Sequence, residues 1–469
     1  MSQSSNETAS LYQAHEKIYP REISGRFSKL RNLAAWILLG LFYTVAWIRI
    51  DGQQLVLFDL PARKFYVFGL TFWPQDFLLL TVLLIIAALS LFFFTALAGR
   101  LWCGYACPQT VWTEVFVALE RFTEGNRMQR MKLDQGPWDR NKLWRKSAKQ
   151  FLWITFSLWT GFTFVGYFTP IHELGAKVLA LETGPWETFW LLFYGFATYG
   201  NAGFLREQVC KYMCPYARFQ SAMFDRDTLV IAYDPERGEP RGKRKRKADL
   251  ETLGLGDCID CTWCVQVCPT GIDIRDGLQY ECIACGACVD ACDQIMDKMN
   301  YPRGLIKYTT QNTIDHQPSR IMRPRIYIYI VLLLALISAF IFGVGGRDPL
   351  IVDVIRDRNA LYRVASDGAV ENAYTLRLIN KTDVPQEYRI AIEEAGYDLR
   401  TWPEIAVAAG AVQGVPVTVR RIAGQANDAQ AVAGYSSAGQ IIHFVISTQA
   451  EEQPPVVESS RFFGPESQP

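Results

Sequence analysis

Histidine is scarce in this sequence, which has only His15, His172, His316 and His443 among its 469 residues. None of them lies in the middle of a long apolar run, whereas a transmembrane haem relay needs histidine ligands inside its spans. The sequence also lacks a G-x-G-x-x-G motif after a predicted strand, and it lacks a P-loop. We therefore expect no b-type haem, and nothing in the sequence supports a nicotinamide dehydrogenase or an ATPase.

No charge of one sign dominates the chain, because the formal net charge is only +1. Proteins that bind nucleic acid usually present an excess of positive charge, so no nucleic acid is expected as a partner. The run 241–247 is a local exception and is almost entirely basic. It suits either an anionic partner or a solvated linker that marks one side of a membrane, and we favour the linker.

Cysteine is absent before Cys103 and after Cys292, although the chain has 12 cysteines in all. A secreted disulfide framework spreads its cysteines through the exported part of a protein. Here the cysteines gather in segments whose charge pattern indicates the cytoplasm, and their spacings are typical of metal binding.

Five apolar segments are long enough to cross a bilayer core, which takes about 20 helical residues. They lie near residues 33–50, 76–98, 151–170, 187–205 and 325–345. The first apolar run begins near Leu33, after a polar start, so we expect a membrane anchor and no cleavable signal peptide. The sequence therefore predicts an α-helical bundle of about five spans, four of them within 33–205.

The basic residues predict how these spans are oriented. Lys and Arg gather in the N-terminal segment 1–32, in the loop 99–150 and in the segment 206–324, whereas the short loop 171–186 has only Lys177. Cytoplasmic loops carry such an excess, so these three basic segments are expected on the cytoplasmic side. With five spans, the region after the last span lies outside.

The C-terminal region has the pattern of a β domain. Short runs that alternate or are rich in β-branched residues are separated by turn-forming stretches. These runs are Tyr374–Ile379, Glu387–Ile392, Val415–Arg420 and Ile441–Ile446. They predict an all-β sandwich over residues 350–450. The proline-containing polar tail, 451–469, is expected to be disordered.

Eight of the cysteines form two runs with the same spacing, C-x₂-C-x₂-C-x₃-C. The runs consist of Cys258, Cys261, Cys264 and Cys268, and of Cys282, Cys285, Cys288 and Cys292. In such runs three thiolates hold one [4Fe–4S] cluster and the fourth reaches the neighbouring cluster. The predicted ligand sets are Cys258, Cys261, Cys264 and Cys292 for one cluster, and Cys282, Cys285, Cys288 and Cys268 for the other.

The two runs resemble those of bacterial two-cluster ferredoxins, which implies a ferredoxin-type α+β module at about 250–300. One departure is that Cys292 is followed by Asp293 where the ferredoxin pattern has proline. The alternative is a pair of structural zinc sites. Zinc sites use two C-x₂-C pairs separated by a longer loop, so the zinc interpretation fits poorly.

The remaining four cysteines form a duplicated motif, Cys-x-Tyr-x-Cys-Pro, at Cys103–Pro108 and at Cys210–Pro215. Each copy follows a predicted span, so two related hairpins present the same motif at the membrane edge. Cysteines at i and i+4 share one face of a helix, and the proline then interrupts that helix or begins the next. The motif residues that carry candidate ligand atoms are Cys103, Cys107, Cys210, Cys214 and Met213.

Together these thiolates suit Cu(I), zinc or an iron–sulfur cluster, and the spacing does not decide between them. The alternative is that the four cysteines bind no metal and only pack between helices, as buried free cysteines often do. Because the motif occurs twice in matching positions, we favour a redox site that holds copper or a third cluster.

The duplicated motif, the two ferredoxin runs, a further span and an outside β domain together resemble one family. This is the family of cytochrome c oxidase accessory proteins called CcoG, FixG or RdxA, and the resemblance covers residues from about Arg21 to Gln449. It implies an immunoglobulin-like fold for the β domain and a location in the bacterial inner membrane, with that domain in the periplasm. It also implies the reduction of Cu(II) to Cu(I) for assembly of a cbb₃-type oxidase.

The expected partners are therefore the membrane, copper ions and the subunits or assembly factors of that oxidase. The electron donor is left open between a cytoplasmic donor and a quinol. One alternative function is a quinol dehydrogenase-like relay across the membrane, as in NapH and NosR. Another is a non-catalytic assembly scaffold, although a scaffold does not need two redox clusters.

Overall fold

Five helices overlap the predicted spans in the computed structural model, which describes residues 17–50, 52–246, 253–358, 360–382, 384–401, 404–421, 439–448 and 454–464. They are α1 (Arg26–Val45), α2 (Phe77–Ala98), α6 (Arg140–Val165), α8 (Pro185–Thr198) and α15 (Pro324–Gly345). Each overlaps one of the predicted spans, and α8 is continued by the π-helix η2 (Tyr199–Leu205). In the described part of the chain, only α2 and α15 are long and apolar enough to cross a membrane by composition. The five-span bundle therefore stays a prediction.

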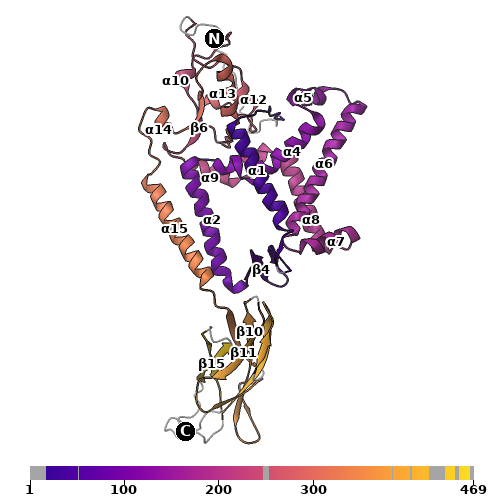
Figure 1. The fold of residues 1–469 in the computed structure, drawn as a ribbon, viewed down its shortest axis with the longest axis vertical. Helices are drawn as coiled ribbons and strands as arrows, with labels where there is room; N and C mark the ends of the chain where they lie inside the picture. The colour runs from indigo at the N-terminus through magenta and orange to yellow at the C-terminus, as the bar shows by residue number, and fades with distance from the viewer. Residues whose placement is uncertain are drawn as a thin grey trace, which may run out of the picture. The chain divides into compact units, whose positions relative to one another are not determined.

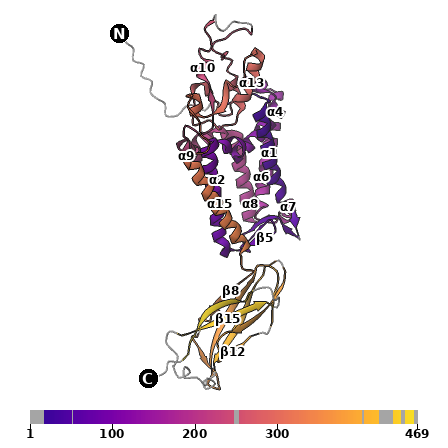
Figure 2. The same cartoon turned by 60° about the vertical axis from the view of Figure 1, so that its left-hand side comes forward.

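The chain divides into two compact units, Met1–Phe340 and Ile341–Pro469. In the first unit α6 packs against both α8 and α4 (Pro108–Glu124), and α2 stands apart from these helices (Figures 1 and 2). No side chain in the most apolar stretch of α2 is buried by the rest of the described chain. Such a surface is suited to lipid, which agrees with the composition of this helix.

A small β region between α1 and α2 was missing from the sequence-based expectations. It comprises the hairpin β1 (Arg49–Ile50) and β2 (Gln53–Gln54), and an antiparallel sheet of β3 (Val56–Asp59), β4 (Lys64–Val67) and β5 (Leu70–Phe72). The predicted first span, 33–50, is therefore too long at its end, because α1 stops at Val45. Buried Gln54 fixes the region by donating to the carbonyl oxygen of Gly166 at 2.7 Å and accepting from the backbone N–H of Ile171 at 3.0 Å.

Several shorter helices connect the long helices and carry the cysteine–proline motifs. They are η1 (Pro74–Asp76), α3 (Leu101–Tyr105), α5 (Arg127–Gln135), α7 (Ile171–Ala180), η3 (Val209–Met213) and α9 (Pro215–Met223). The helix α5 begins with a capping box, in which Asn126 and Gln129 bond reciprocally to each other's backbone N–H. Prolines occupy the first positions of α4 and α9, where no backbone N–H is needed.

The cysteine-rich module is built on a two-stranded antiparallel sheet and several short helices. Its elements are β6 (Val230–Tyr233), α10 (Pro235–Gly238), α12 (Trp263–Gln266), η4 (Ile274–Asp276), α13 (Ala287–Met299), β7 (Ile306–Thr309) and α14 (Gln311–Ile314). Residues from the sheet and from α13, among them Ile231 and Met296, form one core with the cysteines. Gly286 precedes α13 with φ of +74°, a conformation that favours glycine.

The module is joined to the membrane helices by direct contacts. The carboxylate of Asp290, in α13, accepts hydrogen bonds from the backbone N–H groups of Phe27 at 3.2 Å and Ser28 at 2.8 Å. These N–H groups belong to the first turn of α1, which has no intrahelical acceptor for them. A carboxylate at this end also interacts favourably with the helix dipole. The guanidinium of Arg21 stacks 3.7 Å from the ring centroid of Trp263.

The second unit is a β-sandwich. Its strands are β8 (Leu350–Arg356), β9 (Arg363–Val364), β10 (Val370–Asn380), β11 (Gln386–Ile392), β12 (Tyr397–Arg400), β13 (Ile405–Val407), β14 (Val412–Arg421), β15 (Gln440–Thr448) and β16 (Val456–Phe462). One sheet has the order β12-β14-β10-β8, with β9 beside β10, and the other has the order β13-β11-β15-β16. Inward residues of both sheets, such as Leu376 and Phe444, share one core. The predicted all-β domain is confirmed, and each predicted strand lies in an observed one.

The expectation of a disordered tail is wrong for part of 451–469. Strand β16 pairs with β15, and Phe462 at its end is fully buried. The apolar residues of this strand were outweighed in the sequence by the polar residues and prolines around them. Residues 451–453 and 465–469 lie outside the described part of the chain.

Candidate redox sites

The eight cysteines of the ferredoxin-type runs line two separate cavities. We call the cavity lined by Cys258, Cys261, Cys264 and Cys292 the first cluster cavity. The second cluster cavity is lined by Cys268, Cys282, Cys285 and Cys288, with Cys264 also on its wall. Their volumes are about 360 and 330 Å³. Each cavity thus gathers four thiols that come from both cysteine runs.

The walls between the thiols are mostly apolar, with residues such as Ile274 and Leu305. Burial raises the pKa of Cys264 and of Cys282 to about 12. Burial likewise raises the pKa of Cys288 well above its usual range. Thiols of this kind give up their protons when a metal binds, because only the thiolate is a ligand. The donor set fits iron–sulfur clusters, which are held by four cysteine thiolates.

The two cysteine–proline motifs have related but not identical structures. Cys103 lies in α3, the chain leaves the helix at Ala106, and Cys107 is the residue that precedes the first turn of α4. Cys210 lies in the π-helix η3, and Cys214 precedes the first turn of α9. The expectation that each pair shares one continuous helical face is therefore wrong. The helix breaks before the second cysteine because the proline begins a new helix.

The four cysteines of these motifs nevertheless come together, and we call them the four-cysteine site. Burial and then the nearby thiol of Cys107 raise the pKa of Cys103 to about 12, and Cys210 and Cys214 act on it in the same direction. Burial opposes ionisation of Cys107 as well, but the backbone N–H groups of Thr110 and Gln109 at the start of α4 favour its thiolate. N–H groups directed at sulfur are among the groups that tune metal–thiolate centres.

The four-cysteine site lies directly against the second cluster cavity. Gly104 packs so tightly that a Cβ atom there would lie 2.8 Å from the carbonyl oxygen of Ile283 and 3.0 Å from the Cα of Cys285. The side chain of Cys103 belongs to the same apolar cluster as these two residues. Four described residues of this cluster, Ile283, Cys285, Ala287 and Cys288, line the second cluster cavity, whereas only Trp263 lines the first. The second cavity is therefore the one that adjoins the membrane edge.

Buried Arg100 connects the four-cysteine site with the loop of the second cluster cavity. Its guanidinium donates to the carbonyl oxygens of Tyr280 and Ala217, which precede Cys282 and follow Cys214 respectively. Its positive charge opposes the rise in the pKa of Cys103, Cys210 and Cys282 alike. One cation therefore favours the thiolate form of cysteines on both sides of the junction. Arg100 lies just before the first motif in the sequence, and no sequence pattern indicated its contact with the cluster loop.

The second copy of the motif is less enclosed than the first. Tyr105 lies with its hydroxyl 3.5 Å from the carbonyl oxygen of Cys285, whereas its counterpart Tyr212 is 61% exposed. Met213 is 59% exposed, so it stands apart from the partly buried thiols that were expected to be its fellow ligands.

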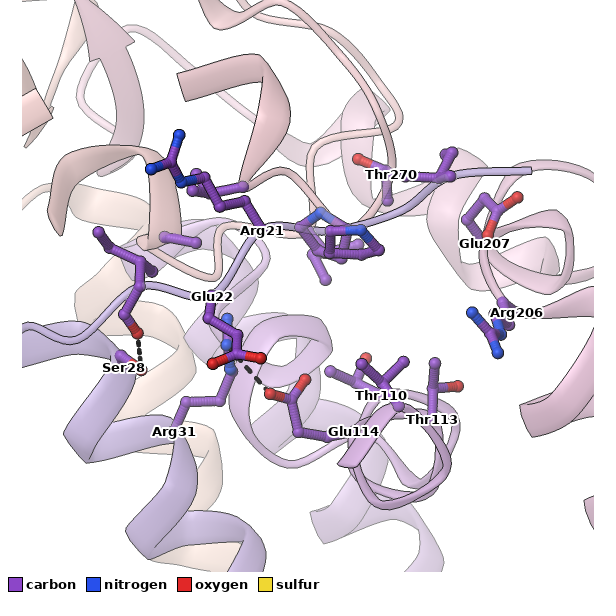
Figure 3. A pocket seen from close by; sticks show the side chains of 18 of the residues that line it. Arg21, Glu22, Ser28, Arg31, Thr110, Thr113, Glu114, Arg206, Glu207 and Thr270 are labelled. Atoms are coloured by element: carbon purple, nitrogen blue, oxygen red, sulfur yellow. Dashed lines mark hydrogen bonds and ion pairs between the residues drawn. The ribbon is translucent and has the colours of Figure 1, made fainter. Parts of the chain in front are cut away.

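A polar pocket, shown in Figure 3 with its charged side chains labelled, has Cys210 among its lining residues. It lies between the start of α1, the helix α4 and the loop after Cys268, and Arg31 and Glu114 form an ion pair of 3.2 Å in its wall. Glu22, Glu207 and Thr270 also line it. Sequence patterns did not indicate this pocket, because its walls come from segments that are far apart in the chain.

Replacement of Gly104 by valine is expected to separate the four-cysteine site from the second cluster cavity. The added atoms meet backbone rather than a flexible side chain, so the cysteine loop must move or the protein must unfold in part. We expect a changed electron paramagnetic resonance (EPR) spectrum of the adjoining cluster and a loss of about 1–3 kcal/mol of stability. The matched control is Gly40→Val in α1, where an added Cβ meets nothing within 4 Å. Equal changes of the EPR spectrum and of stability in the two variants would contradict the close packing of Gly104.

Comparison with known proteins agrees with this geometry. Residues 205–311 match the 4Fe–4S dicluster domain family, and residues 80–122 match a 4Fe–4S binding domain family. Residues 340–465 match the family described as the IG-like fold at the C-terminal of FixG. The chain is 38% identical over 453 residues to the nitrogen fixation protein FixG of Rhizobium meliloti, covering 89% of this chain and 83% of that protein. The chain belongs to the FixG family.

The comparison with protein RdxA supports the same family assignment. This FixG-family chain is 42% identical over 403 residues to protein RdxA of Cereibacter sphaeroides, covering 82% of this chain and 83% of RdxA. A crystal structure of a FixG-related protein from Vibrio parahaemolyticus is 33% identical, with a TM-score of 0.21, and covers 25% of this chain and 97% of that one. The family resemblance predicted from the motifs is confirmed. With its 4Fe–4S domains and two apolar helices, this FixG-family chain is a membrane-associated iron–sulfur redox protein.

Proposed function

We propose that this protein is a membrane-bound electron-transfer protein that reduces Cu(II) to Cu(I) for assembly of a cbb₃-type cytochrome c oxidase. The observation that carries the proposal is the contact of the second cluster cavity with Cys103, Gly104 and Arg100. This contact supports electron transfer between the second cluster and the thiols of the four-cysteine site, because Gly104 packs against the loop that carries Cys285. Thiolates stabilise Cu(I) relative to Cu(II), which favours the reduction.

In this proposal the two ligand sets are those that line the cavities. Cys258, Cys261, Cys264 and Cys292 hold one [4Fe–4S] cluster, and Cys268, Cys282, Cys285 and Cys288 hold the other. The clusters supply one-electron chemistry, and each Cu(II) ion takes one electron to become Cu(I). The apolar walls exclude water from the thiolates, and Arg100 stabilises negative charge at the junction. The excess of Lys and Arg in three segments supports a cytoplasmic location for the module in a bacterium and a periplasmic location for the β unit.

The four-cysteine site is proposed as the place where the electron leaves the protein's own clusters. A second candidate for these four thiols is a third cluster, which is favoured by the 4Fe–4S binding domain match over residues 80–122, a range that includes Cys103 and Cys107. A cluster there would pass the electron on to Cu(II) bound nearby, so the overall reaction is the same.

Metal analysis of the anaerobically purified full chain separates these candidates. About eight iron atoms per chain would leave the four thiols for copper, and about twelve would assign a third cluster to them. The variant with both Cys103→Ser and Cys214→Ser is expected to lose about four irons only in the second case.

The same double variant tests the function. The normal protein, reduced with dithionite and then freed of it by gel filtration, is expected to form Cu(I) from added Cu(II), followed with a Cu(I)-specific chelator; dithionite-driven reduction has this meaning throughout. The variant is expected to form Cu(I) no faster than the buffer does, while its two ferredoxin-type clusters keep their EPR signals. Unchanged copper reduction in the variant would remove the four-cysteine site from the proposal.

A further inference from the structure

A second concavity, distinct from the polar pocket, lies where the membrane helices meet the ferredoxin-type module. It is a groove of about 1110 Å³ between the first half of α1, the helix α3 and the strand β7. Leu30, Leu33 and Ile37 of α1 line it together with Leu101 of α3, and all four are exposed. These side chains continue the apolar surface of a predicted span. The groove therefore suits a ligand that arrives from the lipid phase.

Two tyrosine hydroxyls interrupt this apolar surface. Tyr105 and Tyr308 line the groove, and their oxygen atoms lie 3.4 Å apart. The hydroxyl of Tyr308 donates to the carbonyl oxygen of Ala284 at 2.7 Å, so its proton is already engaged. A tyrosine oxygen in this state can still accept a hydrogen bond. The groove is thus prepared for an apolar molecule that carries a hydroxyl donor, a feature that a lipid acyl chain lacks.

The polar end of the groove adjoins the second cluster cavity. Ala284, which accepts from Tyr308, lies between Cys282 and Cys285, and both cysteines line that cavity. Tyr105 belongs to the first cysteine–proline motif. A molecule held by the two hydroxyls is therefore separated from the cavity by little more than one backbone segment. A redox-active ligand at this position can exchange electrons with the cavity.

We propose that the groove binds the head group of an isoprenoid quinol, which is the electron donor of this protein. The inference rests on the proposed function for the use made of the electrons. Oxidation breaks the two O–H bonds of the quinol and gives the quinone, two protons and two electrons. The protons pass to water at the open side of the groove, beside Arg26, and the two electrons are accepted one by each cluster. One quinol thereby supports the reduction of two Cu(II) ions.

Binding is tested on the full chain in detergent with an azidoquinone photolabel. We expect labelled peptides from the first half of α1 or from β7, and we expect added menaquinol to compete for them. Leu33→Trp fills the groove without touching a cysteine and is expected to lower the labelling about tenfold, equivalent to about 1.4 kcal/mol. The matched control is Leu84→Trp in α2, which is 61% exposed and lies outside the groove, and it is expected to label normally.

Function is tested with the same variants by menaquinol-driven and dithionite-driven formation of Cu(I). Leu33→Trp is expected to lose the menaquinol-driven rate and to keep the dithionite-driven rate, because dithionite bypasses the groove. Labelling that Leu33→Trp leaves unchanged, or that maps to other helices, would overturn the quinol site alone. Absence of dithionite-driven Cu(I) formation in the normal protein would instead overturn the proposed function.

Discussion

Cys288→Ser is expected to abolish copper reduction even when dithionite is supplied, whereas Cys261→Ser is expected to leave much of it. Both variants lose one ligand of a cluster, and each is expected to lose about four irons. They differ in place: Cys288 lines the cavity that adjoins Cys103, and Cys261 lines only the first cavity. Dithionite reduces exposed centres directly, so the second cavity alone is sufficient to carry electrons to the membrane edge.

The measurement is a comparison of iron content, EPR signals and Cu(I) formation for the two variants side by side. The remaining cluster of each variant reports whether the module is still folded, since both cysteine runs contribute to each cavity. Equal loss of copper reduction in the two variants, with one cluster intact in each, would contradict an electron path that leaves the module through the second cavity. The result expected from the geometry is a clear difference in favour of Cys261→Ser.

Glu120→Gln is expected to be among the most destabilising changes outside the cluster cavities. This carboxylate in α4 is fully buried and lies 2.8 Å from Arg206, 3.4 Å from Arg130 and 3.5 Å from Lys17. Removing one partner from a buried set of charges leaves the others uncompensated, which costs about 3–5 kcal/mol. A large fall in melting temperature at pH 7 is therefore expected. The matched control is Glu173→Gln, whose partly exposed pair with Lys177 is worth well under about 1 kcal/mol.

The pH dependence of this effect follows from the charge of Glu120. Although burial acts the other way, Arg206 and Lys17 lower the pKa of Glu120 from its ordinary value of 4.5 to about 2. A carboxyl whose pKa is lowered on folding stabilises the protein above its unfolded pKa, by about 3 kcal/mol for this shift. That stabilisation is lost as the pH falls from about 4.5 to about 2. The stability difference between the normal protein and Glu120→Gln should shrink over this range, and a constant difference would contradict the assignment.

Some features of this protein were predictable because short-range patterns in the sequence indicate them. The distribution of Cys258 to Cys292 between two ligand sets follows from spacing alone, and the structure gathers the same cysteines around each cavity. The strands of the β unit were indicated by alternation, as in Tyr374–Ile379, because one face of each strand is buried.

Other features depend on residues that are distant in sequence, and no local pattern marked them. Two predicted spans separate Lys17 from Glu120 in the sequence, so no local pattern near either residue indicates that they pair. The approach of Gly104 to Ile283 likewise joins two segments whose sequences are each compatible with many partners. The sheet of β3 to β5 was hidden because its strands are only three or four residues long and lie between two longer apolar helices.

The unequal enclosure of the two motif copies has a consequence for how this sequence can change over time. A substitution in the first copy is expected to disturb the ferredoxin-type module, because Gly104 and Tyr105 contact the loop that carries Cys285. In the second copy the corresponding side chains, Tyr212 and Met213, are mostly exposed. Its intervening residues are consequently free to diverge or to adapt to another protein, while its cysteines are not. The two copies of the motif are therefore expected to differ in how many substitutions they tolerate.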